Sequence, residues 1–392
     1  MEHRCRIADR MEHIRPFYVM RLLARARELE AQGRTIIHME VGEPDFDTPD
    51  PITRAGRQAL AEGHTHYTPA TGLPELRRAI ANYYQGRYGQ RVASDRIVVT
   101  PGSSGALQLL VSVLLNPGDE VLLPDPGYPC NRHFVHLVGG VPVALPVGPE
   151  SQFQPTAEAV ADAWSERTRA VLLGSPSNPT GTLLTPDELR AIHRVVRERD
   201  GILIADEVYQ GLVYEGETFT ALALADDLFV INSFSKFFGM TGWRLGWLVA
   251  PSGYVEPLDR LAQNIFLSAS TPAQYAALAA FGEETALILE QRRCEFQRRR
   301  DYLLPALEDV GFRFPVMPGG AFYLYADCSG ITDDSFRFAN ELLEQAGVAV
   351  TPGLDFGDHL PEHHIRFAYT TDLERLQEGV RRIKEFLRKR GG

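Results

Sequence analysis

Lys236 lies in a run of aromatic, serine and glycine residues, and its type is unusual for this chain. The chain has 40 Lys plus Arg residues, yet only three of them, Lys236, Lys384 and Lys389, are lysines. The other two lysines fall in a charged C-terminal stretch, where either cation would serve. A desolvated ammonium can lose its proton and attack a carbonyl, whereas a guanidinium cannot. Lys236 is therefore a candidate for a Schiff base with an aldehyde; the alternative is a surface lysine beside a turn.

Two segments carry groups that can bind a phosphate. Ser103 and Ser104 follow an apolar run and open a helical pattern, where free backbone N–H groups and the helix dipole favour an anion. Ser233, Ser235 and Arg244 surround the lysine, and hydroxyls with a guanidinium can clamp a phosphate. Helix capping is the alternative for the first pair. Both segments indicate a phosphate within reach of the lysine.

Four further polar residues follow apolar runs and would suit an aromatic ring. Asp206 ends such a run, and a buried carboxylate is costly unless it meets a cation such as a protonated pyridine nitrogen. Tyr209 can bond to a ring oxygen, Asn178 presents an amide between two prolines, and Tyr128 can stack on the ring. Each residue taken singly has an ordinary alternative. Asp206 could be bound by loop amides, Asn178 could belong to a plain turn, and Tyr128 could be a core or surface tyrosine. Together with the lysine and the phosphate groups, these residues indicate pyridoxal phosphate.

The segments that position these residues predict an α/β domain. Between residues 96 and 251, short apolar runs alternate with helical patterns. Continuous apolar runs imply strands buried on both faces, hence a largely parallel sheet covered by helices. Ligands bind such sheets beyond the carboxyl ends of the strands, which is where the candidate residues fall. The runs are 97–99, 121–123, 141–143, 170–173, 202–205, 229–231 and 245–249.

The rest of the chain predicts a second, smaller α+β domain. A helix is expected over 17–32, ending at Gly33, and a long helix over 283–309. We place the large domain at residues 46–285 and the small domain at 1–45 plus 286–392. Short strands and helices of the small domain are expected at 320–327, 335–346, 348–351, 364–369 and 372–390.

Composition narrows the classes of function. A chain of 392 residues exceeds the usual single core, and 44% hydrophobic with 23% charged residues is typical of a soluble globular protein. The net charge of −11 argues against nucleic acid or an anionic membrane as the main partner. The four cysteines are far apart and form no metal-binding pattern, so we expect reduced thiols, no metal site and a cytoplasmic location. No secretory or membrane-spanning segment is predicted either.

The motifs, in their order along the chain, resemble those of the class I/II aminotransferases, the pyridoxal-phosphate enzymes of the aspartate aminotransferase fold type. The resemblance extends over essentially the whole chain, and the lysine motif is its most specific part. It implies fold type I, with a large α/β domain and a smaller α+β domain. The matching segments are Gly42-Glu43-Pro44-Asp45-Phe46, residues 67–77, Ser177-Asn178-Pro179-Thr180-Gly181, Asp206-Glu207-Val208-Tyr209 and residues 233–246.

The resemblance implies a role for each candidate residue around the cofactor. Lys236, Asp206 and Tyr209 would be catalytic, with Lys236 forming the Schiff base and Asp206 pairing with the ring nitrogen. Tyr209 and Asn178 would bind the ring oxygen, and Tyr128 would stack on the ring. The phosphate would be surrounded by Ser103, Ser104, Ser233, Ser235 and Arg244.

The resemblance also implies how substrate and subunits are arranged. Arg366 would bind the substrate's α-carboxylate, with Gly42 and Asn178 beside it. Tyr67 would reach the phosphate of a neighbouring subunit, which implies a homodimer with shared active sites. In one place the chain departs from the family pattern, because Cys130-Asn131 follows the Pro-Gly-Tyr-Pro turn where a second aromatic residue is common.

The function implied is a ping-pong transfer of an amino group from an L-amino acid to a 2-oxo acid. A β-lyase or cyclising lyase on the same fold is one alternative, although the Gly-Met-Thr-Gly-Trp-Arg sequence after Lys236 favours a transferase. A non-catalytic binding or regulatory protein is another. Aspartate, alanine, branched-chain and aromatic donors all stay open. The apolar segment 16–20 argues against a strict aspartate enzyme.

Overall fold

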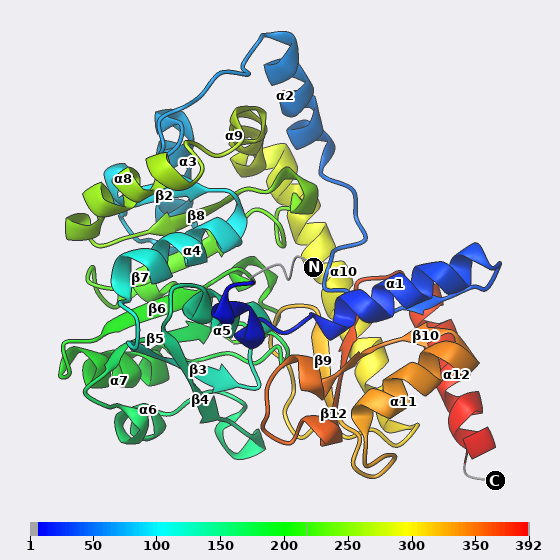
Figure 1. The fold of residues 1–392 in the computed structure, drawn as a ribbon. Coiled ribbons are helices and arrows are strands. Elements are labelled where there is room, and N and C mark those ends of the chain that lie inside the picture. The colour runs from blue at the N-terminus through cyan, green and yellow to red at the C-terminus, as the bar shows by residue number, and fades with distance from the viewer. Residues whose placement is uncertain (1–6, 217, 391–392) are drawn as a thin grey trace, which may run out of the picture.

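A seven-stranded sheet forms the centre of the larger part of the molecule (Figure 1). The computed structural model describes residues 7–216 and 218–390. The strand order is β2-β8-β7-β6-β5-β3-β4, and only β8 runs antiparallel to its neighbours. Every predicted apolar run forms one of these strands, which confirms the largely parallel α/β sheet. The strands are β2 Ile97–Thr100, β3 Glu120–Asp125, β4 Val141–Pro146, β5 Thr168–Gly174, β6 Ile202–Asp206, β7 Phe229–Ser233 and β8 Gly246–Val249.

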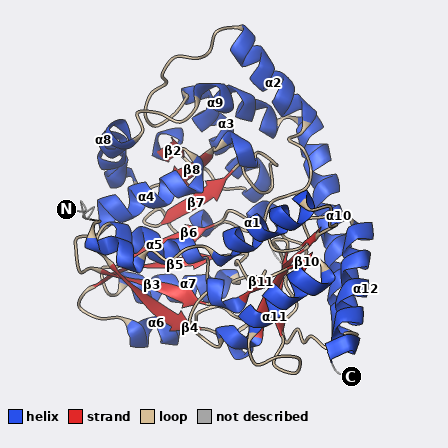
Figure 2. Ribbon diagram, turned by 45° about the vertical axis from the view of Figure 1, so that its right-hand side comes forward, coloured by secondary structure: helices blue, strands red, loops and turns tan. Residues whose placement is uncertain are grey.

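Helices cover both faces of this sheet, as Figure 2 shows. Successive side chains of a strand point to opposite faces, and here they join two different hydrophobic clusters. In β6, for example, Ile204 belongs to one cluster, while Leu203 and Ala205 belong to the other. One face packs against α4 Gly102–Leu114, α5 Pro129–Leu137 and α8 Val255–Ile265. The other packs against α2 Asp50–Ala61, α3 Pro74–Tyr88, α6 Ala157–Ala163, α7 Pro186–Arg197 and α9 Thr271–Leu278.

One strand is less buried than its apolar sequence predicts. Strand β4 lies at the edge of the sheet, with β3 as its single neighbour. Val141 at its start is 39% exposed, whereas the strands in the middle of the sheet are buried on both faces. An edge strand can be covered on its free side only by another segment. Residues 141–144 also line a cavity.

The C-terminal part forms a second, smaller unit together with the N-terminal helix. Its three-stranded antiparallel sheet has the order β11-β12-β9, and a short parallel pair joins β1 to β10. The observed elements fall close to the predicted ranges. They are α1 Tyr18–Ala31, β1 Ile37–His38, α10 Glu283–Glu308, β9 Tyr323–Asp327, α11 Ser335–Glu341 with a π-helical turn Leu342–Ala346, β10 Val348–Ala349, β11 Thr351–Pro352, β12 His364–Ala368 and α12 Leu373–Arg390.

The N-terminal segment packs on the C-terminal part rather than on the large sheet. Leu22 and Leu29 of α1 share a hydrophobic cluster with Leu343 and Ala349. In Figure 1 the blue α1 accordingly lies beside β10. This packing is what a small domain made of 1–45 plus 286–392 requires, and we keep those boundaries as a proposal.

The direction of the strands determines where a site can form. Strand β2 is antiparallel to β8, and β8 is antiparallel to β7, so β2 runs in the same direction as β7 and the other parallel strands. The carboxyl ends of β2, β3, β5, β6 and β7 therefore meet along one edge of the sheet. The segments that follow these strands carry most of the candidate residues.

Candidate active site

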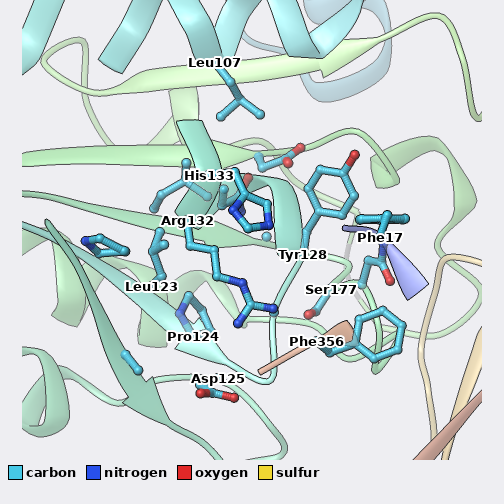
Figure 3. A pocket seen from close by; sticks show the side chains of 18 of the residues that line it. Phe17, Leu107, Leu123, Pro124, Asp125, Tyr128, Arg132, His133, Ser177 and Phe356 are labelled. Atoms are coloured by element: carbon cyan, nitrogen blue, oxygen red, sulfur yellow. The ribbon is translucent and has the colours of Figure 1, made fainter. Parts of the chain in front are cut away.

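A cavity of ≈ 520 Å³ lies at this edge of the sheet. Its walls come from the loops after the parallel strands, from the N-terminal segment and from the C-terminal part (Figure 3). A pocket of this size is typical of small-molecule sites. It brings together eight of the predicted residues: Gly42, Ser103, Tyr128, Asn178, Asp206, Tyr209, Lys236 and Arg366.

Lys236 reaches this cavity from the loop after β7. Its Nζ atom donates a hydrogen bond to the Gly42 carbonyl at 2.7 Å. The same Nζ lies 6.0 Å from the ring centroid of Tyr209 and 5.8 Å from that of Phe322. Burial lowers the pKa of Lys236 to about 8, and the nearby positive charge of Arg366 acts in the same direction. About a tenth of this amine is therefore neutral, and nucleophilic, at pH 7.

The loop that carries Lys236, between β7 and β8, is anchored by the buried Phe234. Strand β8 returns against β7, so the loop begins and ends at the same sheet edge, with Ser233 paired to Gly246. The Phe234 N–H donates to the Leu245 carbonyl at 3.1 Å, and the Phe234 side chain is fully buried. Because the Phe234 side chain is buried, the backbone two residues before Lys236 is fixed. The Lys236 side chain can then point into the cavity.

Asp206 is the last residue of β6 and presents its carboxylate to the same cavity. Burial raises the pKa of Asp206 to about 6, while a hydrogen bond from the Val208 N–H at 3.0 Å and the charge of Lys236 act against this rise. Within the described chain, no basic side chain forms an ion pair with it. A buried carboxylate without a cationic partner is a suitable receptor for a protonated ring nitrogen.

Arg366 of β12 is held between two aromatic rings. Its guanidinium carbon lies 4.3 Å from the Tyr323 ring centroid and 4.7 Å from that of Phe356. One terminal nitrogen donates to Asn178 Oδ1 at 2.8 Å, and the other donates to the Glu40 carbonyl at 2.6 Å. The buried Nε has no hydrogen-bond partner among the described residues. Since buried donors are normally paired, this guanidinium is prepared for an anionic partner.

Tyr323 links this arginine to the residues near the lysine. Its hydroxyl lies 2.9 Å from the Tyr209 hydroxyl. It also occupies the space next to Gly42, where an added Cβ atom would overlap the Tyr323 hydroxyl. The glycine at position 42 is therefore needed for the close approach of its backbone to Tyr323, and it leaves the carbonyl free to receive Lys236.

The start of α4 and Arg244 form a common surface. Gly102 has φ +70, and an added Cβ there would lie 2.8 Å from an Arg244 terminal nitrogen. Ser103 follows in the first turn of α4 and lines the cavity, whereas Ser104 is exposed beside it. Arg244 itself has φ +53, an uncommon conformation for a residue with a side chain, and donates to Ser235 Oγ at 3.5 Å. Free amides, a hydroxyl and a guanidinium thus converge on one place.

Five of the predicted cofactor residues do not line the cavity: Ser104, Ser235 and Arg244, which lie beside it, and also Ser233 and Tyr67. Ser233 is 1% exposed and does not line the cavity; its hydroxyl accepts a hydrogen bond from the Ser235 N–H at 3.0 Å. Tyr67 is 80% exposed and is also outside the cavity. Their roles at the phosphate stay predictions, and that of Tyr67 depends on a second subunit.

The residues present fit pyridoxal phosphate. The cavity provides a lysine with a lowered pKa and a buried carboxylate without a cation. It also provides an anion-binding helix start next to an arginine. No group of three or more metal-binding side chains occurs among the described residues. Of the cysteines, Cys130, Cys294 and Cys328 are free, and Cys5 lies outside the described residues.

Several residues that shape the cavity were not predicted. Tyr323 could have been found, because the pair Gly319-Gly320 shortly before its strand indicates a bend or a close backbone approach. The Glu40 carbonyl and Phe356 carry no such signal, since a main-chain acceptor and an apolar ring are chemically ordinary in sequence.

Known proteins resemble this chain over nearly its whole length. The sequence model of the family "Aminotransferase class I and II" matches residues 34–383. The (5-formylfuran-3-yl)methyl phosphate transaminase of Methanocaldococcus jannaschii is 39% identical over 98% of this chain and 100% of its own length. The valine–pyruvate aminotransferase of Mycobacterium tuberculosis is 38% identical over 95% and 96% of the two chains. An aspartate/prephenate aminotransferase of Thermus thermophilus is 38% identical over 97% and 98%.

Solved structures agree with these sequence relatives. A crystal structure of an aminotransferase from Mycobacterium tuberculosis superposes with a TM-score of 0.95 at 38% identity, covering 98% of this chain and 100% of that one. The aspartate aminotransferase of Thermus thermophilus with maleate gives a TM-score of 0.93 at 37% identity, covering 97% and 100%.

The fold and the cavity define a transferase of fold type I. The chain belongs to the class I and II aminotransferases. It is an enzyme that transfers an amino group between an amino acid and a 2-oxo acid, as the sequence predicted. The relatives described above are named as aminotransferases or transaminases, which favours transfer over the lyase and non-catalytic alternatives. Among the described helices, none combines the length and the apolar composition needed to cross a membrane.

Proposed function

We propose that this aminotransferase holds pyridoxal phosphate at Lys236 and works by a ping-pong mechanism, first taking an amino group from an L-amino acid and then giving it to a 2-oxo acid. The observation that carries the proposal is the pairing of two unusual ionisable groups in one cavity. The pKa of Lys236 is lowered to about 8 and that of Asp206 is raised to about 6. Groups with such perturbed pKa values in a cavity are candidates for catalysis.

The residues around the cavity divide into those that hold the cofactor and those that hold the substrate. Asp206 would accept a hydrogen bond from the ring nitrogen. Ser103 and Arg244, with Ser104, Ser233 and Ser235 near them, would bind the phosphate. Tyr209, Asn178 and Tyr128 would bind the ring oxygen and the ring face. When bound, pyridoxal phosphate supplies an aldehyde and an electron-accepting ring, which lower the energy needed to remove a proton from the substrate's Cα.

Arg366 would hold the substrate's α-carboxylate. Its guanidinium is fixed by Tyr323, Phe356 and Asn178 before any ligand arrives, so little ordering is left to be done on binding. A planar guanidinium can bond a carboxylate through two parallel N–H groups. This contact would orient the amino acid in the cavity shared with Lys236.

Lys236 would move the proton. Its Nζ is held at the Gly42 carbonyl by the 2.7 Å hydrogen bond, so the amine is retained within the cavity when it is not bonded to the cofactor. With a pKa of about 8, the amine can both accept and return a proton near neutral pH. The same side chain would serve as cofactor anchor and as general base and acid.

The replacement Lys236→Ala tests the assignment. We expect the rate of amino transfer to fall by about 10²- to 10⁴-fold or more, because the general base is lost together with the anchor. Lys384→Ala, which removes an exposed lysine of α12, is the matched control and should leave the rate unchanged. Near wild-type turnover by the Lys236→Ala enzyme would overturn the assignment.

We also propose a homodimer with shared active sites. The support is Tyr67, a large side chain that is 80% exposed and has no role within its own cavity. Sedimentation would give the oligomeric state. Co-expressing Tyr67→Ala and Lys236→Ala chains tests the sharing, because a mixed dimer would keep one intact site and regain activity that neither parent has. The predicted cytoplasmic location is proposed with it and is checked by cell fractionation.

A further inference from the structure

The segment that follows β1 receives two of the proposed active-site groups. Each carbonyl of residues 39–42 accepts a hydrogen bond from another part of the molecule. The Glu40 carbonyl accepts from Arg366 at 2.6 Å and from the Thr351 hydroxyl at 3.0 Å. Two residues further on, the Gly42 carbonyl accepts from Lys236 at 2.7 Å. The position of the Glu40 main chain therefore determines where the Arg366 guanidinium is held.

The side chain of Glu40 is a buried carboxylate that needs a positive partner. It is 0% exposed, and its Oε1 atom lies 2.7 Å from Nδ1 of His38. Its other oxygen, Oε2, has no hydrogen-bond partner among the described residues. A carboxylate buried in this way is costly in free energy unless a cation lies next to it. The His38 ring is the group placed to supply that charge.

His38 lies between two carboxylates. Its second ring nitrogen, Nε2, lies 3.2 Å from Oε1 of Glu30 in α1. A neutral imidazole has one N–H group and an imidazolium has two, so only the charged ring can donate to both carboxylates at once. The hydrogen bond with Glu40 raises the pKa of His38 above its ordinary value near 6.5, and the charges of Glu40 and Glu30 act in the same direction, while burial opposes them.

The other elements packed around β1 direct their charges elsewhere. From α12, Arg375 donates to the Ile36 carbonyl at 2.6 Å and Arg382 donates to the Thr35 carbonyl at 2.7 Å. Strand β10 pairs with β1 through residues 348–349, a valine and an alanine that carry no charge. The two carboxylates that face His38 therefore decide the charge of its ring.

We propose that His38 is a positioning residue for Arg366: its imidazolium holds the Glu40 carboxylate, and the Glu40 main chain in turn holds the guanidinium. The inference rests on the proposed function, because it takes Arg366 as the residue that binds the substrate's α-carboxylate. When His38 loses its proton, the Glu40 carboxylate is left buried without a cation and moves toward water. The Glu40 carbonyl moves with it, Arg366 loses its fixed position, and the amino donor binds more weakly.

The direction of the pH dependence follows from the charge. A histidine whose folded pKa is raised makes its contribution fully below the ordinary value of about 6.5, and this contribution is lost as the pH rises through the folded pKa. His38 therefore favours donor binding on the acidic side of its folded pKa and loses this effect on the basic side.

His38→Gln in the enzyme loaded with pyridoxal phosphate tests the proposal. The first half-reaction with one amino donor is followed by the loss of the absorbance of bound pyridoxal phosphate at about pH 6 and about pH 9, on either side of a raised histidine pKa. We expect the half-saturating donor concentration to be about 3- to 10-fold above wild type at the lower pH, the usual size for coupled neighbours, and close to wild type at the higher pH. The limiting rate should change by less than about 2-fold.

A second variant makes the test independent of the first. Glu40→Gln removes the buried charge that requires the imidazolium, so the pH-dependent difference should disappear, and His38→Gln with Glu40→Gln should bind the donor better than His38→Gln alone. His193→Gln is the matched control. His193 is a buried histidine of α7 that lies 2.9 Å from the Asp227 carboxylate and does not line the cavity, so its loss should leave donor binding unchanged.

Nuclear magnetic resonance of the same loaded enzyme, labelled in its histidine rings, gives a readout that does not depend on turnover. The ring signal missing from the His38→Gln spectrum belongs to His38. We expect it to titrate above about 6.5 in the wild type and at a lower pH in Glu40→Gln.

The outcomes separate this inference from the proposed function. If His38→Gln binds the donor like the wild type at both pH values, if its limiting rate falls by the same factor, or if the His38 signal titrates below about 6.5, the positioning role is wrong while transamination stands. If no donor reacts, or if Arg366→Gln does not raise the half-saturating concentration, the proposed function fails and the positioning role fails with it. Bound pyridoxal phosphate absorbance and thermal unfolding show that each variant is folded, and Glu40→Gln decides the question if His38→Gln does not fold.

Discussion

The guanidinium carbon of Arg366 lies 4.3 Å from the centroid of the Tyr323 ring. The hydroxyl of the same ring lies 2.9 Å from the hydroxyl of Tyr209. Tyr323 therefore touches the proposed carboxylate-binding residue with its face and a proposed cofactor-binding residue with its edge. The two halves of the molecule meet at this side chain, since Arg366 and Tyr323 come from the small sheet and Tyr209 follows a strand of the large one.

Two substitutions at Tyr323 separate these contacts. Tyr323→Phe keeps the ring against Arg366 and removes the hydroxyl, whereas Tyr323→Leu removes both. We expect KM for the amino donor to change little in the first variant and to rise about 10-fold in the second, since a cation–π contact in a buried site contributes roughly 1–2 kcal/mol. Steady-state kinetics with one donor measure the difference. Equal KM values in the two variants would contradict a role for the ring in holding Arg366.

Gly42→Ala is expected to reduce activity by at least about 10-fold. The new methyl group would overlap the Tyr323 hydroxyl, so the backbone must shift, and the carbonyl that receives Lys236 shifts with it. Gly86→Ala is the matched control, because a Cβ there meets open space within α3, and helix propensity predicts a stability gain of up to about 1 kcal/mol. Normal activity of Gly42→Ala would show that position 42 does not set the lysine's place.

Asp206→Asn is expected to stabilise the cofactor-free protein at neutral pH. The folded pKa of about 6 is above the unfolded value near 3.9, so the protonated carboxyl contributes fully below about pH 4 and this contribution is lost as the pH rises through 6. The wild type should therefore be less stable than the Asp206→Asn variant by roughly 2–3 kcal/mol at pH 7 and equal to it near pH 4. Denaturant unfolding at both pH values measures this. With pyridoxal phosphate bound, the order at pH 7 should reverse.

The rate at which the cofactor-free protein takes up pyridoxal phosphate should depend on pH through Lys236. The folded pKa of about 8 is below the ordinary lysine value, so the reactive neutral amine increases about tenfold per pH unit below 8 and levels off above it. Stopped-flow absorbance measurements between pH 6 and pH 10, as suggested by these pKa values, would show the profile. A rate that still rises tenfold per unit near pH 10 would mean that burial does not lower this pKa.

The sheet could be predicted from the sequence because its signal is local. Strands such as β5 and β6 are continuous apolar runs, and a run of this kind needs no knowledge of its partners to be identified. The residues at the ends of these strands, Asn178 and Asp206, could be placed at one edge for the same reason. Parallel strands bring their carboxyl ends together whatever their order in the sheet.

Contacts between distant segments could not be predicted in this way. Arg366 and Asn178 are separated by 188 positions, and Lys236 and Gly42 by 194. Such pairs depend on how the small unit sits against the large sheet, and no local pattern records it. Arg132 and Arg15 on the cavity wall were missed for a related reason. They resemble the many other arginines of the chain until the fold brings both to the same cavity.

The distribution of lysines gives the molecule an unusual surface chemistry. Lys236 is enclosed at the cavity, so the exposed lysine side chains are Lys384 and Lys389, and both lie in α12 near the C-terminus. When the cofactor is bonded to Lys236, reagents that couple to lysine side chains would therefore attach dyes, tethers or solid supports to this one helix. Attachment there would leave the lining of the cavity unmodified, because none of its residues lies in α12.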